Sequence, residues 1–180
     1  MANYAKVKKF DIANGEGIRT SIFFSGCEFG CKGCFNKELC GFNCGKAFTR
    51  EVYENEIKPT INEHVAGISI LGGEPLHYKN IYDVCDLINM FINDFPDKNI
   101  WLWTGYTWEE LYEEMHARNG ENHEYLIALE AILLNIDVLV DGQFIEEQRD
   151  LTLKWRGSRN QRVIDMRKLL RQGKIVLYKD

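Results

Sequence analysis

The stretch Ala66-Gly67-Ile68-Ser69-Ile70-Leu71-Gly72-Gly73-Glu74-Pro75 decides the fold of this 180-residue chain. Its first six residues are apolar or small and predict a buried strand, which the Gly-Gly-Glu-Pro sequence ends abruptly. Residues 78–95 then repeat apolar side chains at helical spacing up to Pro96, and residues 99–103 read as another strand. A strand, a helix and a strand in this order predict a right-handed βαβ unit with parallel strands.

The same alternation extends outward along the chain in both directions. Further runs of apolar and β-branched residues predict strands at 20–24, 136–140, 162–165 and 175–178. Helical spacing predicts a helix from Thr49 toward Pro59 and helices at 107–116 and 125–134, the last two separated by the polar stretch 118–122. These elements predict an α/β fold with a parallel sheet. We expect one domain over residues 1–180, because no linker or repeat interrupts the pattern.

A glycine follows each of four predicted strands, and these glycines are Gly26, Gly72, Gly105 and Gly142. Ligands of parallel α/β folds bind at the carboxyl ends of the strands, and glycine lets the backbone approach a ligand closely there. We therefore expect one shared site at this edge. A closed eight-stranded barrel typically needs about 250 residues, so the chain is expected to form a truncated barrel. Its site would be open on one side and would suit a large partner.

The composition is that of a globular protein, with 45% hydrophobic and 12% aromatic residues. The formal charge of −5 argues against a general nucleic-acid binder, which usually carries a basic face. The first ten residues are polar and basic, unlike a signal peptide, and no stretch approaches the roughly 18 apolar residues of a membrane span. We therefore expect a cytoplasmic protein that binds neither nucleic acid nor membrane.

Three cysteines, Cys27, Cys31 and Cys34, lie in a short loop directly after the strand at 20–24, spaced C-x3-C-x2-C. Three thiolates this close can hold a metal centre and leave one coordination position open, which distinguishes a reactive site from a structural one. Clustered cysteines in a reducing compartment more often bind metal or do redox chemistry than form disulfides. Cys85 differs, because it follows the apolar spacing of the helix at 78–95 and reads as a core residue.

The spacing of the cysteines alone leaves a second interpretation open. Cys31 and Cys34 together with Cys40 and Cys44 have the pairing of a four-thiolate structural zinc site. A small binding module stabilised by zinc, without chemistry of its own, is therefore the alternative class of protein. Outside such a four-thiolate site, Cys40 and Cys44 would belong to a second small metal site, with zinc as its metal, or would be two ordinary free thiols.

The C-x3-C-x2-C loop followed downstream by Gly-Gly-Glu-Pro resembles the radical S-adenosylmethionine superfamily. The resemblance implies that Cys27, Cys31 and Cys34 ligate three irons of a 4Fe–4S cluster. The fourth iron then binds the amino and carboxylate groups of S-adenosylmethionine, a position that a fourth thiolate would block. Reduction of the cluster cleaves the sulfonium and yields a 5′-deoxyadenosyl radical, which abstracts hydrogen. The resemblance assigns no side chain as a catalytic acid, base or nucleophile.

The resemblance also implies how S-adenosylmethionine is held. Gly72 and Gly73 are expected to contact the methionine part through their backbone, and Glu74 to help fix its ammonium end. Most members of the superfamily have an aromatic residue just before the third cysteine, where this chain has Gly33. The adenine is therefore expected along Gly33, Cys34 and Phe35, and residues 104–106 are the candidates for the ribose.

Several further segments narrow the resemblance to the activating enzymes of anaerobic ribonucleotide reductases. They are the segments 11–19, 34–37, 100–106, 138–144 and Trp155-Arg156-Gly157-Ser158-Arg159-Asn160-Gln161-Arg162. The implied task is to create a glycyl radical on the large catalytic subunit of the reductase, with reduced flavodoxin or a similar protein as electron donor. The alternatives within this chemistry are activation of a different glycyl-radical enzyme, or a small radical enzyme that acts on a purine-like metabolite.

Other conspicuous residues have a simpler interpretation. The four histidines lack ligand spacing and are expected on the surface, although His77 adjoins the Gly-Gly-Glu-Pro sequence. Trp101 and Trp103 alternate on a strand and are expected to pack in the core. The arginines between Arg156 and Arg162 would bind a carboxylate or the partner surface, or form a solvated basic turn. Residues 167–171 are expected to form a solvated helix face.

Overall fold

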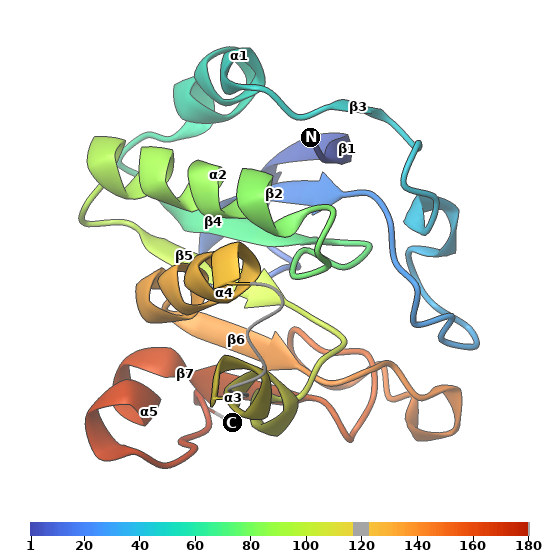
Figure 1. Ribbon diagram of the computed structural model, residues 1–180. Coiled ribbons are helices and arrows are strands. Elements are labelled where there is room, and N and C mark those ends of the chain that lie inside the picture. The colour runs from blue at the N-terminus through green and yellow to red at the C-terminus, as the bar shows by residue number, and fades with distance from the viewer. Residues whose placement is uncertain (117–122, 180) are drawn as a thin grey trace.

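The computed structural model describes residues 1–116 and 123–179. A seven-stranded sheet with the order β3-β1-β2-β4-β5-β6-β7 forms its centre and does not close into a barrel (Figure 1). The strands are β1 (Asn3–Asp11), β2 (Ile18–Phe24), β3 (Lys46–Ala47), β4 (Val65–Gly72), β5 (Asn99–Trp103), β6 (Val138–Asp141) and β7 (Arg162–Asp165).

The sheet is parallel in its centre and antiparallel at its edges. Strands β2, β4, β5 and β6 run parallel to one another, as the alternation of strands and helices in the sequence predicts. By contrast, β1 pairs antiparallel with β2, β3 with β1 and β7 with β6. The prediction of a parallel sheet is therefore wrong for the edges. The connection from β6 to β7 stays at the carboxyl end of β6 and does not cross back over the sheet (Figure 1), so β7 runs antiparallel to β6.

The helical segments follow the sequence prediction closely in position. They are α1 (Arg50–Val52), α2 (Ile81–Asp94), α3 (Trp108–His116), α4 (His123–Asn135) and α5 (Met166–Gln172), with short turns η1 (Lys37–Leu39), η2 (Tyr53–Ile57), η3 (Lys58–Thr60) and η4 (Glu146–Gln148). The predicted helix after Thr49 is three successive turns of different winding, the last containing Pro59, which lacks an amide hydrogen. The polar stretch 118–122 lies outside the described residues.

Helix α2 begins at Ile81, three residues later than predicted. The residues before it form turns, in which the His77 N–H donates to the Glu74 carbonyl and the Asn80 N–H donates to the His77 carbonyl. The Asn80 side chain donates to the carbonyls of Ser25 and Glu74, so it holds two strand ends together instead of continuing a helix.

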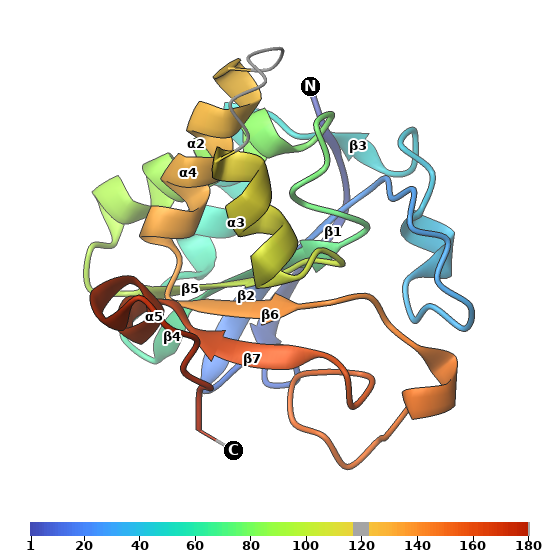
Figure 2. The same ribbon diagram turned by 60° about the horizontal axis from the view of Figure 1, so that its bottom comes forward.

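Two layers of side chains cover the two faces of the sheet. Helices α2 and α4 pack on one face, where even-numbered strand residues such as Ile22, Ile70 and Leu102 form the largest core (Figures 1 and 2). On the other face, Trp101 and Trp103 stack with ring centroids 5.8 Å apart. Trp101 is 1% exposed, which confirms its expected core role, whereas Trp103 packs beside it but is only partly buried. Trp155 and Tyr178 complete this cluster.

The C-terminal segment differs in part from the prediction. Within 175–178, only Leu177 forms a bridge to Ile164, so the predicted strand is not a full strand of the sheet. Helix α5 presents Arg167, Lys168 and Arg171 to solvent, as expected. None of the helices in the described part of the chain is both long and apolar enough to cross a membrane.

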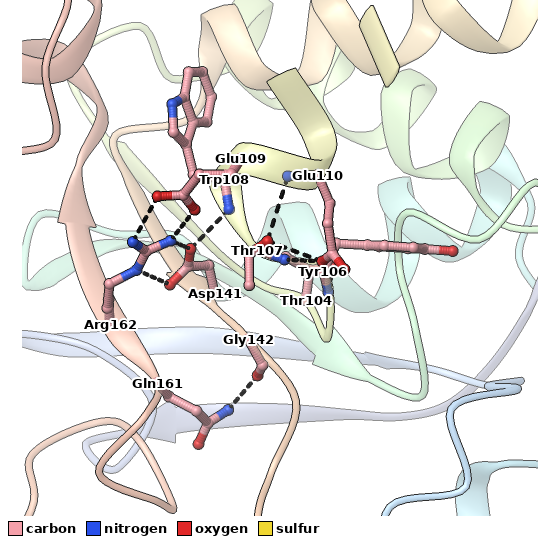
Figure 3. Close-up of polar contacts among 10 residues, drawn as sticks. All are labelled: Thr104, Tyr106, Thr107, Trp108, Glu109, Glu110, Asp141, Gly142, Gln161 and Arg162. Carbon is pink, nitrogen blue, oxygen red and sulfur yellow. Dashed lines mark hydrogen bonds and ion pairs between the residues drawn. The ribbon is translucent and has the colours of Figure 1, made fainter. Parts of the chain in front are cut away.

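An ion-pair network joins β6, β7 and the start of α3 (Figure 3). Arg162 donates to both oxygens of Asp141, at 3.0 and 2.5 Å, and to both oxygens of Glu109, at 2.9 and 2.6 Å. Asp141 is 1% exposed and also accepts the Trp108 N–H. Arg162 is therefore a structural cross-link, and the interpretation of residues 156–162 as a solvated turn is wrong for it.

Candidate functional site

A cavity of about 420 Å³ lies at the carboxyl ends of β2, β4, β5 and β6. Figure 1 shows the loop that follows β2 and the long loop between β6 and β7 at this same end of the sheet. Three of the four strand-end glycines, Gly72, Gly105 and Gly142, line the cavity. Its volume is in the range of small-molecule sites, which spans roughly 300–1,000 Å³.

The three predicted ligand cysteines, Cys27, Cys31 and Cys34, line this cavity together. All three are half-buried free thiols. Burial raises the pKa of Cys27 to about 11, although the Phe29 N–H bonds to its sulfur. Burial also raises the pKa of Cys31, against a hydrogen bond from the Phe144 N–H. The Cys27 thiol is therefore protonated at neutral pH until a metal displaces the proton.

Backbone hydrogen bonds lock the Gly-Gly-Glu turn to the residues that introduce the cysteine loop. The Gly73 N–H donates to the Phe24 carbonyl at 2.8 Å, and the Glu74 N–H donates to the Gly26 carbonyl at 2.7 Å. A Cβ on Gly73 would lie 2.3 Å from the Gly26 oxygen, so only glycine permits this approach. Cys34 and Gly72 are 38 positions apart in the sequence. The two motifs nevertheless form one structural unit.

Glu74 is buried in this unit, with an exposed fraction of 1%. Its Oε1 accepts from the Leu76 N–H at 2.9 Å and from the Thr104 hydroxyl at 2.8 Å, and its Oε2 accepts from the Gly105 N–H at 2.7 Å. Burial raises the pKa of Glu74 to about 7, and the three hydrogen bonds oppose this shift. Glu74 therefore joins the carboxyl ends of β4 and β5 and is not a solvated loop carboxylate.

The three residues predicted for the adenine are arranged unequally. Cys34 and Phe35 line the cavity, whereas Gly33 has a φ of +72° and faces the Glu146 carboxylate, which lies 2.8 Å from a built Cβ. The Phe35 ring contacts Phe144 with centroids 5.1 Å apart and is 52% exposed. Among the ribose candidates, Thr104 and Gly105 line the cavity.

Cys40 lies outside the cavity lining but close to the ligand cysteines. Its pKa is raised by burial and then by the neighbouring Cys34, and its sulfur lies 3.8 Å from the Asn36 carbonyl. Cys44 packs instead against an apolar cluster that contains Phe23. Within residues 1–116 and 123–179, no three His, Cys, Asp or Glu side chains are arranged to hold a single metal ion. A 4Fe–4S cluster has its thiolates on different irons, so its ligands need not converge on one point.

His77 was expected on the surface and is buried, with an exposed fraction of 5%. Its Nδ1 accepts from the Lys79 N–H, and its Nε2 lies 3.3 Å from a carboxylate oxygen of Glu28 in the cysteine loop. The Phe42 ring packs on it at 4.6 Å. The other three histidines are exposed, as predicted. Proximity to the Gly-Gly-Glu-Pro sequence was the only signal in the sequence that separates His77 from them.

Sequence reasoning also missed how much of the cavity the β6–β7 loop supplies. Residues of this loop that line the cavity are Gln143, Phe144, Asp150, Leu151, Leu153, Trp155, Arg156, Gly157 and Gln161. Most of these residues belong to no chemical motif, because they contribute to the site only by lining the cavity. The resemblance of the segment 155–162 was the one signal that pointed here.

This geometry of three thiols on an α/β scaffold agrees with the comparison to known families. Residues 13–164 match the family model described as a 4Fe-4S single cluster domain, which defines the class of the protein.

Relatives specify the class further. The chain is 39% identical over 161 residues to a protein of Vibrio cholerae (88% of this chain, 95% of the relative) and 36% identical over 167 residues to one of Escherichia coli K12 (92% and 99%). It is 31% identical over 163 residues to one of phage T4 (89% and 92%). All three are named anaerobic ribonucleoside-triphosphate reductase-activating protein. The chain belongs to this family.

Proposed function

We propose that this protein activates an anaerobic ribonucleoside-triphosphate reductase as a radical S-adenosylmethionine enzyme, and that its sheet is a truncated barrel of that superfamily. One observation carries the proposal: the cysteine loop and the Gly-Gly-Glu turn line the same cavity and are hydrogen-bonded into one unit. The names of the relatives support the choice of the reductase as the target. The whole chain, residues 1–180, would act as one domain.

The chemistry of the cavity fits a 4Fe–4S cluster. Cys27, Cys31 and Cys34 would hold it, since all three thiols line the same cavity. Backbone N–H groups of Phe29 and Phe144 bond to two of the sulfurs and would stabilise them as thiolates. Loading would release the proton of the Cys27 thiol, so cluster binding should be stronger at higher pH.

The part of the cavity lined by the Gly-Gly-Glu turn fits the amino acid end of S-adenosylmethionine. Gly72 and Gly73 present backbone there, and Glu74 presents a carboxylate whose three hydrogen bonds leave acceptor capacity for an ammonium group. Cys34 and Phe35, with the backbone at Gly33, would form the adenine side. When bound, the reduced cluster supplies the electron that cleaves S-adenosylmethionine and so produces the radical that abstracts hydrogen from a glycine.

The open sheet suits a protein substrate. The cavity mouth carries Phe35 and Leu151, which are 52% and 77% exposed. A glycine-bearing loop of the large reductase subunit would reach the cavity from this side, and reduced flavodoxin or a similar protein would supply the electron. An oxygen-sensitive cluster and six free cysteines fit a reducing, cytoplasmic compartment. Activation of a different glycyl-radical enzyme would use the same residues and is the second candidate function.

The test is anaerobic reconstitution followed by three measurements on one sample. We expect brown protein with about four irons and four sulfides. We also expect reductive cleavage of S-adenosylmethionine. Electron paramagnetic resonance should show a glycyl radical on the added reductase subunit.

Serine variants of Cys27, Cys31 and Cys34 should each lose the cleavage reaction. Cys40→Ser, a matched neighbour outside the cavity lining, should keep it. Colourless protein with only zinc bound would contradict the proposal, and a radical on a lyase but not on the reductase would favour the second candidate.

A further inference from the structure

The first residues of the β6–β7 loop contact one of the three cavity cysteines, although more than a hundred residues separate them in the chain. Cys31 Sγ lies 3.9 Å from Gln143 Oε1, and the N–H of the next residue, Phe144, bonds to the same sulfur. Cys27 receives its N–H contact locally, from Phe29. Cys31 thus receives one N–H contact from a distant loop, in addition to a contact from its own backbone.

Side chains from the far end of that loop hold these residues in place. Asn160 Nδ2 donates to the Gln143 carbonyl at 2.8 Å. Gln161 Nε2 donates to the Gly142 carbonyl at 2.9 Å (Figure 3), and its Oε1 accepts the Gly157 N–H at 2.9 Å. Asn160 and Gln161 thereby fix the backbone that bears the Phe144 N–H. Neither residue was assigned a role by the sequence motif in which it lies.

We propose that Asn160 and Gln161 are positioning residues that set the reduction potential of the cluster by holding the Phe144 N–H against Cys31. One-electron reduction adds negative charge to the cluster and its thiolates. An N–H donor directed at a ligand sulfur stabilises that charge and raises the potential, and hydrogen bonds to sulfur are among the principal determinants of cluster potentials. The inference rests on the proposed function, in which Cys31 is a cluster ligand. It adds residues that do not bind the cluster themselves but position a hydrogen-bond donor to that ligand.

The experiment compares Gln161→Ala and Asn160→Ala with the wild type in anaerobic reconstituted protein. Dithionite supplies the electron, and the reduced cluster is followed by electron paramagnetic resonance against measured potential. Both variants should bind the full complement of iron and shift the midpoint potential to more negative values. Gln172→Ala, the same substitution on exposed α5, should leave the midpoint unchanged.

A second readout uses the protein without its cluster. Amide hydrogen exchange of residues 142–145 should be faster in Gln161→Ala than in Gln172→Ala, while exchange in β4 and α2 stays the same. Unchanged midpoint potentials in both variants, with full iron content, would overturn the inference and leave the proposed function intact. Failure of the wild type to bind a cluster at all would instead refute the proposed function.

Discussion

At the scale of single residues, Glu74 has the most unusual environment in the site. A carboxylate with an exposed fraction of 1% has no cationic partner among the contacts that the structure describes, and accepts only neutral donors. Burial in such a place favours the neutral acid, which is why its pKa rises to about 7. At physiological pH the residue is close to its titration midpoint, so a nearby ammonium group would draw it to the charged form.

This environment predicts a particular pH dependence of stability in the protein without cofactors. Between the ordinary pKa of 4.5 and about 7, the unfolded state has lost the Glu74 proton while the folded state retains it. Stability must therefore fall as pH rises through this window, by about 3 kcal/mol. Urea unfolding at pH 4.5, 5.5, 6.5 and 7.5 would measure it.

Glu74→Gln provides the control, because glutamine cannot titrate. The variant places an amide group near the donors of Thr104 and Gly105 and should lose about 1–3 kcal/mol at pH 4.5. The difference between wild type and variant should then narrow as pH rises. A constant difference across the whole range would show that Glu74 is ionised throughout.

At the scale of elements, the β6–β7 loop and the network around Arg162 determine how the end of the sheet is built. Asp141 ends β6, Arg162 begins β7, and Glu109 lies in the first turn of α3, so one guanidinium joins three elements (Figure 3). The next residue after Asp141 is Gly142, which lines the cavity. The network therefore holds the backbone directly before a residue that lines the cavity.

Arg162→Ala should destabilise the protein by about 3 kcal/mol, because it leaves the buried Asp141 carboxylate without its partner. Arg159→Ala is the matched comparison. Arg159 pairs with Asp150 at 3.1 Å but is 72% exposed, so its loss should cost less than about 1 kcal/mol. Thermal or chemical unfolding of both variants measures the difference. Equal losses would mean that the Arg162 network contributes no more than an exposed pair.

At the scale of the whole molecule, the open sheet brings the segments that line the cavity to one end. The cysteine loop, the Gly-Gly-Glu turn and the β6–β7 loop meet there, while helices α2 and α4 pack on one face (Figures 1 and 2). A partner that brings a glycine to the cavity must therefore approach over the residues at its mouth.

Hydrogen exchange of the complex with the large reductase subunit should reveal this approach. Residues 27–36 and 142–161 should become protected when the complex forms, whereas α5 should exchange as in the free protein. Helix α5 contributes no residue to the cavity lining and lies at the opposite end of the sheet (Figure 1), so it serves as the internal reference. Protection of α5 with no change at 27–36 would place the partner on the wrong face for the proposed reaction.

The sequence was informative wherever a local pattern is tied to a local structure. Central strands and helices followed from apolar periodicity, and the cysteine spacing with the Gly-Gly-Glu-Pro turn identified residues that the structure brings to one cavity. Edge strands were less predictable. Strand β1 was missed because only two of its nine residues are buried, and β3 because it has only two residues. The direction of β7 depends on its connection and not on its own residues.

The sequence by itself determined which chemical groups this protein possesses and the order in which its strands reach the site. Spacing along the chain carries that information, because three cysteines within eight positions cannot separate far in space. Only the tertiary structure decided the environments: that Glu74 is buried among neutral donors, that His77 contacts Glu28 of the cysteine loop, and that Asn160 and Gln161 bond to the first residues of the β6–β7 loop. Burial and hydrogen bonding between distant segments are set by the packing of the whole sheet, and no window of sequence contains them.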